Sequence, residues 1–234
     1  MTSSPRSLLF VSALSLAFGF AGAALWSVTG LGNGATHDYL VDNPEILPEM
    51  ANVLQQREAA RRLANVRGDV YSPFPGAVLG NPAGKHVLIE FTDYGCTFCR
   101  HSVGDVKAMI AADPDLKVVI REWPIFEGSD VPARWALAAA RQGKFAAFHD
   151  AMFAAGSTSP EAVQAAAKQA GLDMAAAQQF VGGREAEFEL MKNRSLAQQL
   201  GFEGTPSWVA GEQLLFGAIG QDTLTKALAS ADKS

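Results

Sequence analysis

Cysteine is scarce in this chain: of 234 residues, only Cys96 and Cys99 carry a thiol. A zinc site usually takes four ligands, and neither a second C-x-x-C nor a clustered pair of histidines is present to complete one. A basic stripe is also missing and the net charge is −5, which argues against nucleic acid as a partner. No internal repeat is evident, so the length indicates one good-sized core with appendages.

Charge is absent from residue 7 to residue 36, and residues 8–28 are apolar apart from small residues and serines. Such a segment predicts an export signal or a membrane anchor, which with its linker occupies residues 1–35. Cleavage near Ala23 is one alternative, but the apolar run continues beyond it and favours a retained anchor. Arg6 precedes the run, which predicts that the body lies outside the cytoplasm, in the periplasm or on the extracytoplasmic side of an inner membrane. That compartment is oxidising and suits a redox pair.

The two cysteines form a C-x-x-C directly after the apolar run 87–91 and at the start of a predicted helix. A thiol at a helix N-terminus faces unpaired backbone N–H groups and the positive end of the helix dipole, and both favour the thiolate. Cys96 is therefore predicted to be the attacking thiol, more acidic and more exposed, and Cys99 the resolving one. A structural disulfide, half of a metal site and two unrelated cysteines are the alternatives. The strand-to-helix layout favours a thioredoxin-like redox site.

A strand, a helix and a second strand are predicted in turn at residues 86–92, 96–112 and 116–122. An arrangement of this length is a βαβ unit with parallel strands and a right-handed crossover. A short edge strand is expected before it at residues 77–79, and a hairpin with a closing helix after it at residues 207–229. The sequence therefore predicts an α/β, thioredoxin-like domain at residues 69–234, with an all-helical insertion at 128–202.

Between the apolar segment and this domain, residues 36–68 are predicted to form a helical arm. Apolar residues follow helical spacing along the arm at Ile46, Met50, Val53 and Leu54. Such a stripe fits two arrangements: the arm packs on its own domain, or it associates with the arm of a second copy. The second arrangement predicts a homo-oligomer formed through residues 38–66.

Two further residues are predicted to complete the site. Pro206 follows Thr205 just ahead of the hairpin, where a cis-proline would lie beside the cysteine pair and the backbone of Thr205 could pair with an extended substrate. Glu90 lies in an otherwise apolar strand and could exchange a proton with Cys99. An ordinary trans turn proline and a solvated glutamate are the respective alternatives. Asp93 follows the strand and is expected at the surface or at the entry to the helix.

The chain resembles the DsbA-like thiol–disulfide oxidoreductases in two motifs, E-F-x-x-Y-x-C-x-x-C at residues 90–99 and G-T-P at residues 204–206. The resemblance covers the chain from Val70 to the C-terminus. It implies that the buried glutamate, the two cysteines and the cis-proline of the family correspond to Glu90, Cys96, Cys99 and Pro206.

The arm resembles one branch of that family. Its D-Y-L-x-x-N-P-E at residues 38–45 is similar to the N-terminal segment of the Com1/ScsC-like branch, in which the arm implies oligomerisation and some members isomerise disulfides. One departure concerns the residues between the cysteines. The strongest oxidants of the family carry Pro-His there, whereas this chain has Thr97 and Phe98, which are expected to contact substrate. The loss of a histidine leaves the oxidising strength open.

The expected function is that of an extracytoplasmic thiol–disulfide oxidoreductase that forms or isomerises disulfide bonds in exported proteins. Its expected partners are exported proteins with cysteines and a membrane redox partner that resets the pair, and no cofactor or metal is needed. The alternative is a Cu(I) or other soft-metal binding protein that uses Cys96 and Cys99 in metal tolerance. A glutathione-linked transferase on the same fold ranks last, because such enzymes usually lack the C-x-x-C.

Overall fold

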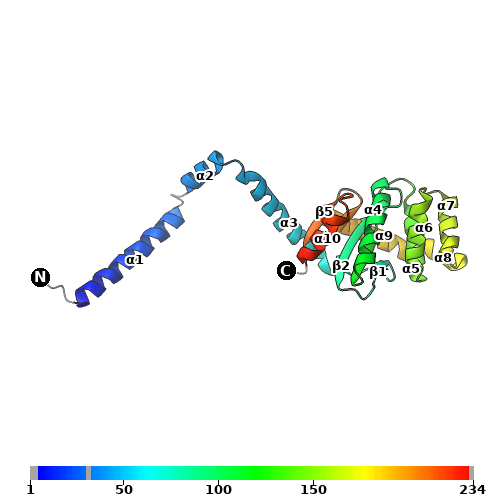
Figure 1. Ribbon diagram of the computed structural model, residues 1–234, viewed down its shortest axis with the longest axis horizontal. Coiled ribbons are helices and arrows are strands. Elements are labelled where there is room, and N and C mark those ends of the chain that lie inside the picture. Colours follow the sequence, from blue (N-terminus) through cyan, green and yellow to red (C-terminus); the bar gives the residue numbers. More distant parts are fainter. Residues whose placement is uncertain (1–4, 30–32, 232–234) are drawn as a thin grey trace. The chain divides into compact units, whose positions relative to one another are not determined.

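The computed structural model describes residues 5–29 and 33–231, and the chain divides into two compact units, Met1–Gln55 and Gln56–Ser234. The first unit contains helix α1 (Pro5–Thr29), helix α2 (Asn33–Asp42) and the first turns of helix α3 (Ile46–Tyr71) (Figure 1). The predicted signal or anchor at residues 8–28 lies within α1. No helix within residues 5–29 or 33–231, however, combines the length and the hydropathy needed to cross a membrane.

The second unit is built on a five-stranded sheet with the order β1-β3-β2-β4-β5. Its strands are β1 (Val78–Gly80), β2 (His86–Thr92), β3 (Leu116–Glu122), β4 (Ser207–Ala210) and β5 (Gln213–Phe216). Strands β2 and β3 are parallel and are joined through α4 (Thr97–Ala112), whereas the other neighbouring pairs are antiparallel. The predicted βαβ unit, the edge position of the short first strand and the hairpin are confirmed.

Helices cover both faces of the sheet, and successive side chains of a strand point to opposite faces. Each strand therefore contributes side chains to two separate cores. On one face, Leu88 of β2 belongs to a core shared with α4 and α10 (Gln221–Ala231). On the other face, Ile89 and Phe91 pack with the last turns of α3 and with α9 (Arg184–Leu200). Each central strand therefore needs apolar residues at the positions that face either side of the sheet, which explains why β2 and β3 are nearly continuous apolar runs.

The predicted helical insertion is present. It contains α5 (Asp130–Arg141), α6 (Phe145–Ala155), α7 (Pro160–Gln169), α8 (Met174–Val181) and α9, and α5 to α8 lie together in Figure 1. A break at Gly143 separates α5 from α6, and the glycine there has a positive φ of 67° that other residues rarely adopt. Ser159 and Asp173 cap α7 and α8 by accepting hydrogen bonds from backbone N–H groups.

Helix α3 continues through residue 68, where the sequence predicted the end of the arm, and its last turns belong to the second unit. Leu63 and Val66 are buried there against the sheet. Arg121 of β3, itself fully buried, holds this end of the helix by donating to the carbonyl oxygen of Val70 at 2.9 Å and to the carboxylate of Glu189 at 3.1 Å. This half of α3 is therefore part of the core of the domain.

Candidate active site

Cys96 is the N-cap residue of α4, with extended backbone angles of φ −83° and ψ 118°. Its sulfur accepts a hydrogen bond from the backbone N–H of Cys99 at 3.4 Å, and its thiol donates one to the carbonyl oxygen of Thr205 at 3.1 Å. Both thiols are free. Cys96 is 2% exposed and Cys99 0%, so the predicted difference in exposure is only slight. Thr97 and Phe98, which lie between them, are exposed.

The two thiols differ strongly in acidity. A hydrogen bond from the Cys99 side chain, helped by the Thr205 side chain and by the backbone N–H groups of Cys99 and Phe98, lowers the pKa of Cys96 to about 5 against the opposing effect of burial. Burial raises the pKa of Cys99 above its ordinary value, and the hydrogen bond to Cys96 raises it further. The prediction that Cys96 is the more acidic thiol is confirmed. A thiolate at Cys96 and a protonated Cys99 are the starting point for attack and resolution.

The Thr205–Pro206 peptide bond is cis, as the sequence predicted. Both residues are buried and lie immediately before β4. The Ser207 hydroxyl donates to the carbonyl oxygen of Gly204 at 2.7 Å and so closes the turn that carries them. The contact between Cys96 and the carbonyl oxygen of Thr205 brings this turn and the start of α4 together. Four of the predicted residues, Cys96, Cys99, Thr205 and Pro206, therefore lie in one place.

Glu90 is buried in β2, which contradicts the alternative of a solvated glutamate. Its partners in the neighbouring strands are Ile120 and Trp208, so it lies between apolar residues on the central strand. Burial raises the pKa of Glu90 to about 8, and the charge of Cys96 raises it as well. A carboxyl group with this pKa can hold or release a proton near neutral pH.

Sequence reasoning missed three buried residues beside this site. Asp93 was expected at the surface or at the entry to the helix; it is buried, and it begins the turn that enters α4. Its carboxylate accepts from the backbone N–H groups of Gly95, Ile125 and Phe126. Tyr94 and Glu122 are also buried, and their side chains hydrogen-bond at 3.0 Å. The available signal was that Glu122 ends an apolar parallel strand, as polar residues at such strand ends often meet at one edge of a sheet.

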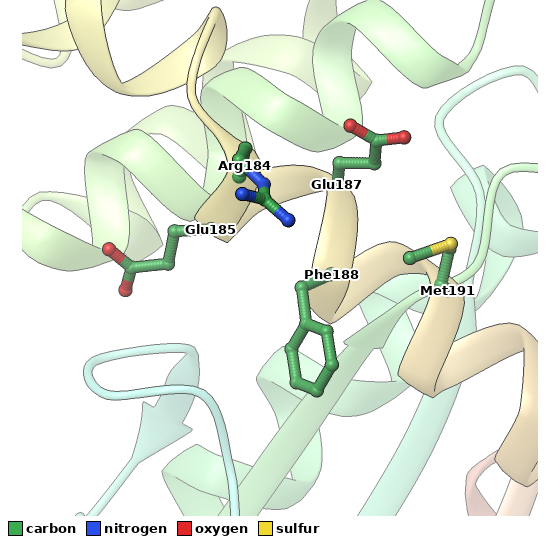
Figure 2. A pocket seen from close by; sticks show the side chains of 5 residues that line it. All are labelled: Arg184, Glu185, Glu187, Phe188 and Met191. Carbon is green, nitrogen blue, oxygen red and sulfur yellow. The ribbon is translucent and has the colours of Figure 1, made fainter.

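A surface pocket lies elsewhere, along the first turns of α9, and Figure 2 shows the side chains that line it. They are Arg184, Glu185, Glu187, Phe188 and Met191. The pocket contains none of the predicted site residues.

Comparison with known families agrees with this geometry. The family model described as Thioredoxin matches residues 74–230, a segment that holds the whole sheet, the cysteines and the Thr205–Pro206 turn. The chain belongs to the thioredoxin family. A second model, described as Copper resistance protein ScsC N-terminal domain, matches residues 34–61 in the arm. Together with the solved structures below, these matches support an assignment to the DsbA-like members, in the ScsC branch.

Three solved structures are similar. A thioredoxin-like oxidoreductase from Silicibacter pomeroyi DSS-3 is 41% identical, with a TM-score of 0.64 over 67% of this chain and 92% of its own. ScsC from Proteus mirabilis, in a transitional conformation, is 26% identical, with a TM-score of 0.65 over 85% and 94%. The thiol-disulfide exchange protein alpha-DsbA2 from Wolbachia pipientis is 23% identical, with a TM-score of 0.69 over 76% and 97%, and shares the fold. No curated protein matches the chain. The family and the paired thiols support a thiol–disulfide oxidoreductase.

Proposed function

We propose that this protein forms or isomerises disulfide bonds in exported proteins, on the extracytoplasmic side of the membrane. The observation that carries the proposal is the position of Cys96. It begins α4, its sulfur accepts from the N–H of Cys99, and its thiol contacts the carbonyl oxygen of Thr205. The site therefore holds an acidic thiol, a resolving thiol and a backbone edge for the substrate together.

In the reducing or isomerising direction, the Cys96 thiolate attacks one sulfur of a substrate disulfide and the other substrate sulfur leaves as a thiolate. In reduction, Cys99 then gives its proton to Glu90 and attacks Cys96 Sγ, which releases the second substrate thiolate and closes the Cys96–Cys99 disulfide. In isomerisation, a different substrate thiolate attacks the substrate sulfur of the mixed disulfide, which forms the new substrate disulfide and returns Cys96 as a thiolate.

In the oxidising direction, a substrate thiolate attacks Cys96 Sγ of that disulfide, and Cys99 leaves and takes the proton back from Glu90. A second substrate thiolate then attacks the substrate sulfur bonded to Cys96, which forms the substrate disulfide and releases Cys96 as a thiolate. A membrane redox partner would exchange the two electrons that reset the pair.

Substrate binding is assigned to the surface around Cys96. The backbone of Thr205 would pair with an extended substrate segment, because main-chain hydrogen bonds accept any sequence. Thr97 and Phe98 are exposed on the first turn of α4, and Phe98 is 62% exposed. An apolar side chain at this position supports contact with unfolded segments, in which apolar residues are accessible.

The chemistry of the pair and the N-terminal segment support this location. Disulfides form and persist in oxidising compartments, whereas thiols of the cytoplasm are kept reduced. A chain whose two cysteines form the redox site and whose N-terminal segment resembles an export signal fits the periplasm.

Self-association through the arm would favour isomerisation, because two active sites that face one cleft can hold a misfolded substrate during reshuffling. Support comes from the first unit, in which large apolar side chains are exposed at Tyr39, Val41, Leu47, Met50, Val53 and Leu54. Leu63 and Val66, in contrast, are buried in the domain. The proposed interface is therefore the part of residues 38–66 that precedes Gln56.

The direction of the reaction is tested by two assays on the full chain. One measures the oxidation of a reduced dithiol peptide, and the other the refolding of a scrambled protein with several disulfides. An oxidase accelerates the oxidation of the dithiol peptide. An isomerase, with its cysteine pair kept reduced, accelerates the refolding of the scrambled protein. If both rates equal those of a Cys96→Ala variant, the proposed function is wrong. The reduction potential of the pair, measured against glutathione, gives the preferred direction independently.

Cu(I) binding is the second candidate, because the family description that matches the arm names copper resistance. That match covers residues 34–61, which contain no cysteine. Copper tolerance through this protein would therefore depend on Cys96 and Cys99. Titration with Cu(I) against a competing chelator tests this candidate, which requires tight binding in the unmodified chain and its loss in Cys96→Ala.

A further inference from the structure

A buried chain of three polar side chains lies beside the redox pair and takes no part in the steps above. The oxygen of the Tyr94 hydroxyl is 3.0 Å from Glu122 Oε1 and 3.2 Å from His149 Nδ1. Glu122 ends β3, Tyr94 is two residues before Cys96, and His149 belongs to α6. All three are buried, and the ring of Phe153 packs on both Tyr94 and His149. These three hydrogen-bonded side chains therefore connect the helical insertion to the turn that precedes Cys96.

The hydroxyl of Tyr94 has one hydrogen, so it can donate only one of these two bonds. If Glu122 is a carboxylate, Tyr94 donates to it and His149 Nδ1–H donates to the Tyr94 oxygen. If Glu122 is a neutral acid, its own hydroxyl donates to Tyr94, and Tyr94 donates to an unprotonated Nδ1. The pKa of His149, which burial lowers to about 4, indicates a neutral imidazole, and a neutral imidazole is compatible with both arrangements. The two arrangements therefore differ in the charge of Glu122.

The surroundings of Glu122 favour the neutral acid. Within the described part of the chain, Glu122 Oε2 has no hydrogen-bond partner, which would be costly for one oxygen of a carboxylate. Burial raises the pKa of Glu122 well above its ordinary value against the lowering effect of the hydrogen bond with Tyr94, and the charges of Asp93 and Glu90 raise it further.

The cations nearby do not compensate a charge on Glu122. The side chain of Arg121 lies on the opposite face of the sheet and pairs with Glu189. Beyond His149, Lys107 is paired with Asp150 at 2.9 Å.

Glu122 is also placed to affect the redox pair. Its register partner is Thr92, and Glu90 lies two residues before Thr92 on the same face of the sheet. A second ionised carboxyl on this face would oppose the ionisation of Glu90. The backbone N–H of Cys96 donates to the carbonyl oxygen of Asp93 at 3.1 Å, so the turn that holds Cys96 includes Tyr94.

We propose that Glu122 is a positioning residue of the redox site: it remains a neutral acid, holds Tyr94 and thereby the turn before Cys96, and leaves Glu90 as the carboxyl that exchanges the proton of Cys99. This inference rests on the proposed function and deepens it. Glu122 acts through Tyr94 and Glu90 and makes no contact with the substrate.

The test compares Glu122→Gln with Glu122→Leu in the full chain. Glutamine keeps the shape and the neutral charge and can hydrogen-bond to Tyr94, whereas leucine cannot. One measurement is the rate at which iodoacetamide alkylates Cys96 as a function of pH. The other is the rate at which Cys99 releases glutathione from a preformed Cys96–glutathione disulfide. Glu161→Gln, at an exposed position of α7, is the control for the loss of a carboxyl group.

The leucine variant should release glutathione about tenfold more slowly, as expected for the loss of one buried hydrogen bond, and the glutamine variant should recover most of that rate. The alkylation midpoint of Cys96 should be the same in the glutamine variant and the unmodified chain. A midpoint lowered by about one pH unit in the glutamine variant would mean that Glu122 is charged, and would overturn the proposal.

An unchanged release rate in the leucine variant would equally overturn it. If that variant does not fold, Tyr94→Phe takes its place, because it removes only the hydroxyl oxygen of the same hydrogen bond. A glutathione release rate about tenfold lower supports the proposal, and a rate equal to that of the unmodified chain overturns it. The alkylation midpoint can be measured without turnover and reports the charge of Glu122. If the proposed function is wrong, the unmodified chain shows no exchange with the glutathione disulfide, so the two failures are distinguishable.

Discussion

Cys96 Sγ lies 3.1 Å from the carbonyl oxygen of Thr205, a residue 109 positions further along the chain. This contact joins the start of α4 to the turn before β4 and brings the acidic thiol to the backbone edge proposed to bind substrate. The same sulfur accepts from the N–H of Cys99 at 3.4 Å. The reactivity of Cys96 thus depends on the folded domain and not on the C-x-x-C alone.

The first prediction concerns the hydrogen bond between the two thiols. Because a hydrogen bond from the Cys99 side chain is the main cause that lowers the pKa of Cys96 to about 5, Cys99→Ala should move the alkylation midpoint of Cys96 to higher pH. Cys99→Ser keeps a donor at the same position and should retain more of the shift. Equal midpoints in the alanine and serine variants would contradict this cause.

The second prediction concerns Glu90 and stability. Burial raises the pKa of Glu90 from 4.5 to about 8, so between these pH values the folded chain holds a proton that the unfolded chain has lost. The free energy of unfolding should therefore fall as pH rises through this window, by at most about 1.4 kcal/mol per pH unit from this group.

Glu90→Gln removes this contribution, so its stability should depend less on pH than that of the unmodified chain. Urea denaturation of the reduced proteins at several pH values measures the difference. Glu161→Gln, which changes an exposed carboxyl, should behave like the unmodified chain. The assignment fails if Glu90→Gln and the unmodified chain lose stability with the same slope.

The third prediction concerns substrate binding by Phe98. Phe98→Ser should raise the KM for an unfolded protein substrate about tenfold, because the apolar contact is lost, and should leave the reduction of a small disulfide unchanged. The matched control is Phe188→Ser, since Phe188 is 66% exposed but lies on α9 away from the cysteines. Equal effects of the two substitutions on KM would rule out a specific role for Phe98.

The fourth prediction concerns the arm. Light scattering should show that the full chain is an oligomer and that a variant with both Leu47→Glu and Leu54→Glu is a monomer, because charges replace exposed apolar residues at the proposed interface. The double variant should keep dithiol exchange and lose most refolding of a scrambled substrate. Phe188→Glu is the control for an added surface charge. A monomeric full chain would remove the physical basis of the isomerase proposal.

The elements of the fold could be predicted because their signals are local. Apolar runs identified β2 and β3, and Glu90 was recognisable as one charge in an apolar strand. The arm was harder, since a helical stripe does not reveal what it packs against. Only the tertiary structure shows that Leu63 and Val66 are buried in the domain.

The rest of the site could not be predicted because it depends on contacts between distant segments. Asp93 follows a strand and looks like a surface residue, yet the backbone N–H groups of Ile125 and Phe126 satisfy its carboxylate. The Tyr94 hydroxyl hydrogen-bonds to Glu122 at the end of β3 and to His149 on the inserted helix α6. None of these pairings has a sequence spacing that identifies it.

The central claim is that Cys96 attacks and Cys99 resolves, and trapping of the mixed disulfide tests it most directly. Cys99→Ala and Cys96→Ala are each incubated with a disulfide-bonded substrate, and the products are separated without reductant and mapped by mass spectrometry. The account predicts that Cys99→Ala accumulates substrate on Cys96 and that Cys96→Ala accumulates none. A substrate adduct on Cys99, formed as fast in the Cys96→Ala variant, would contradict it.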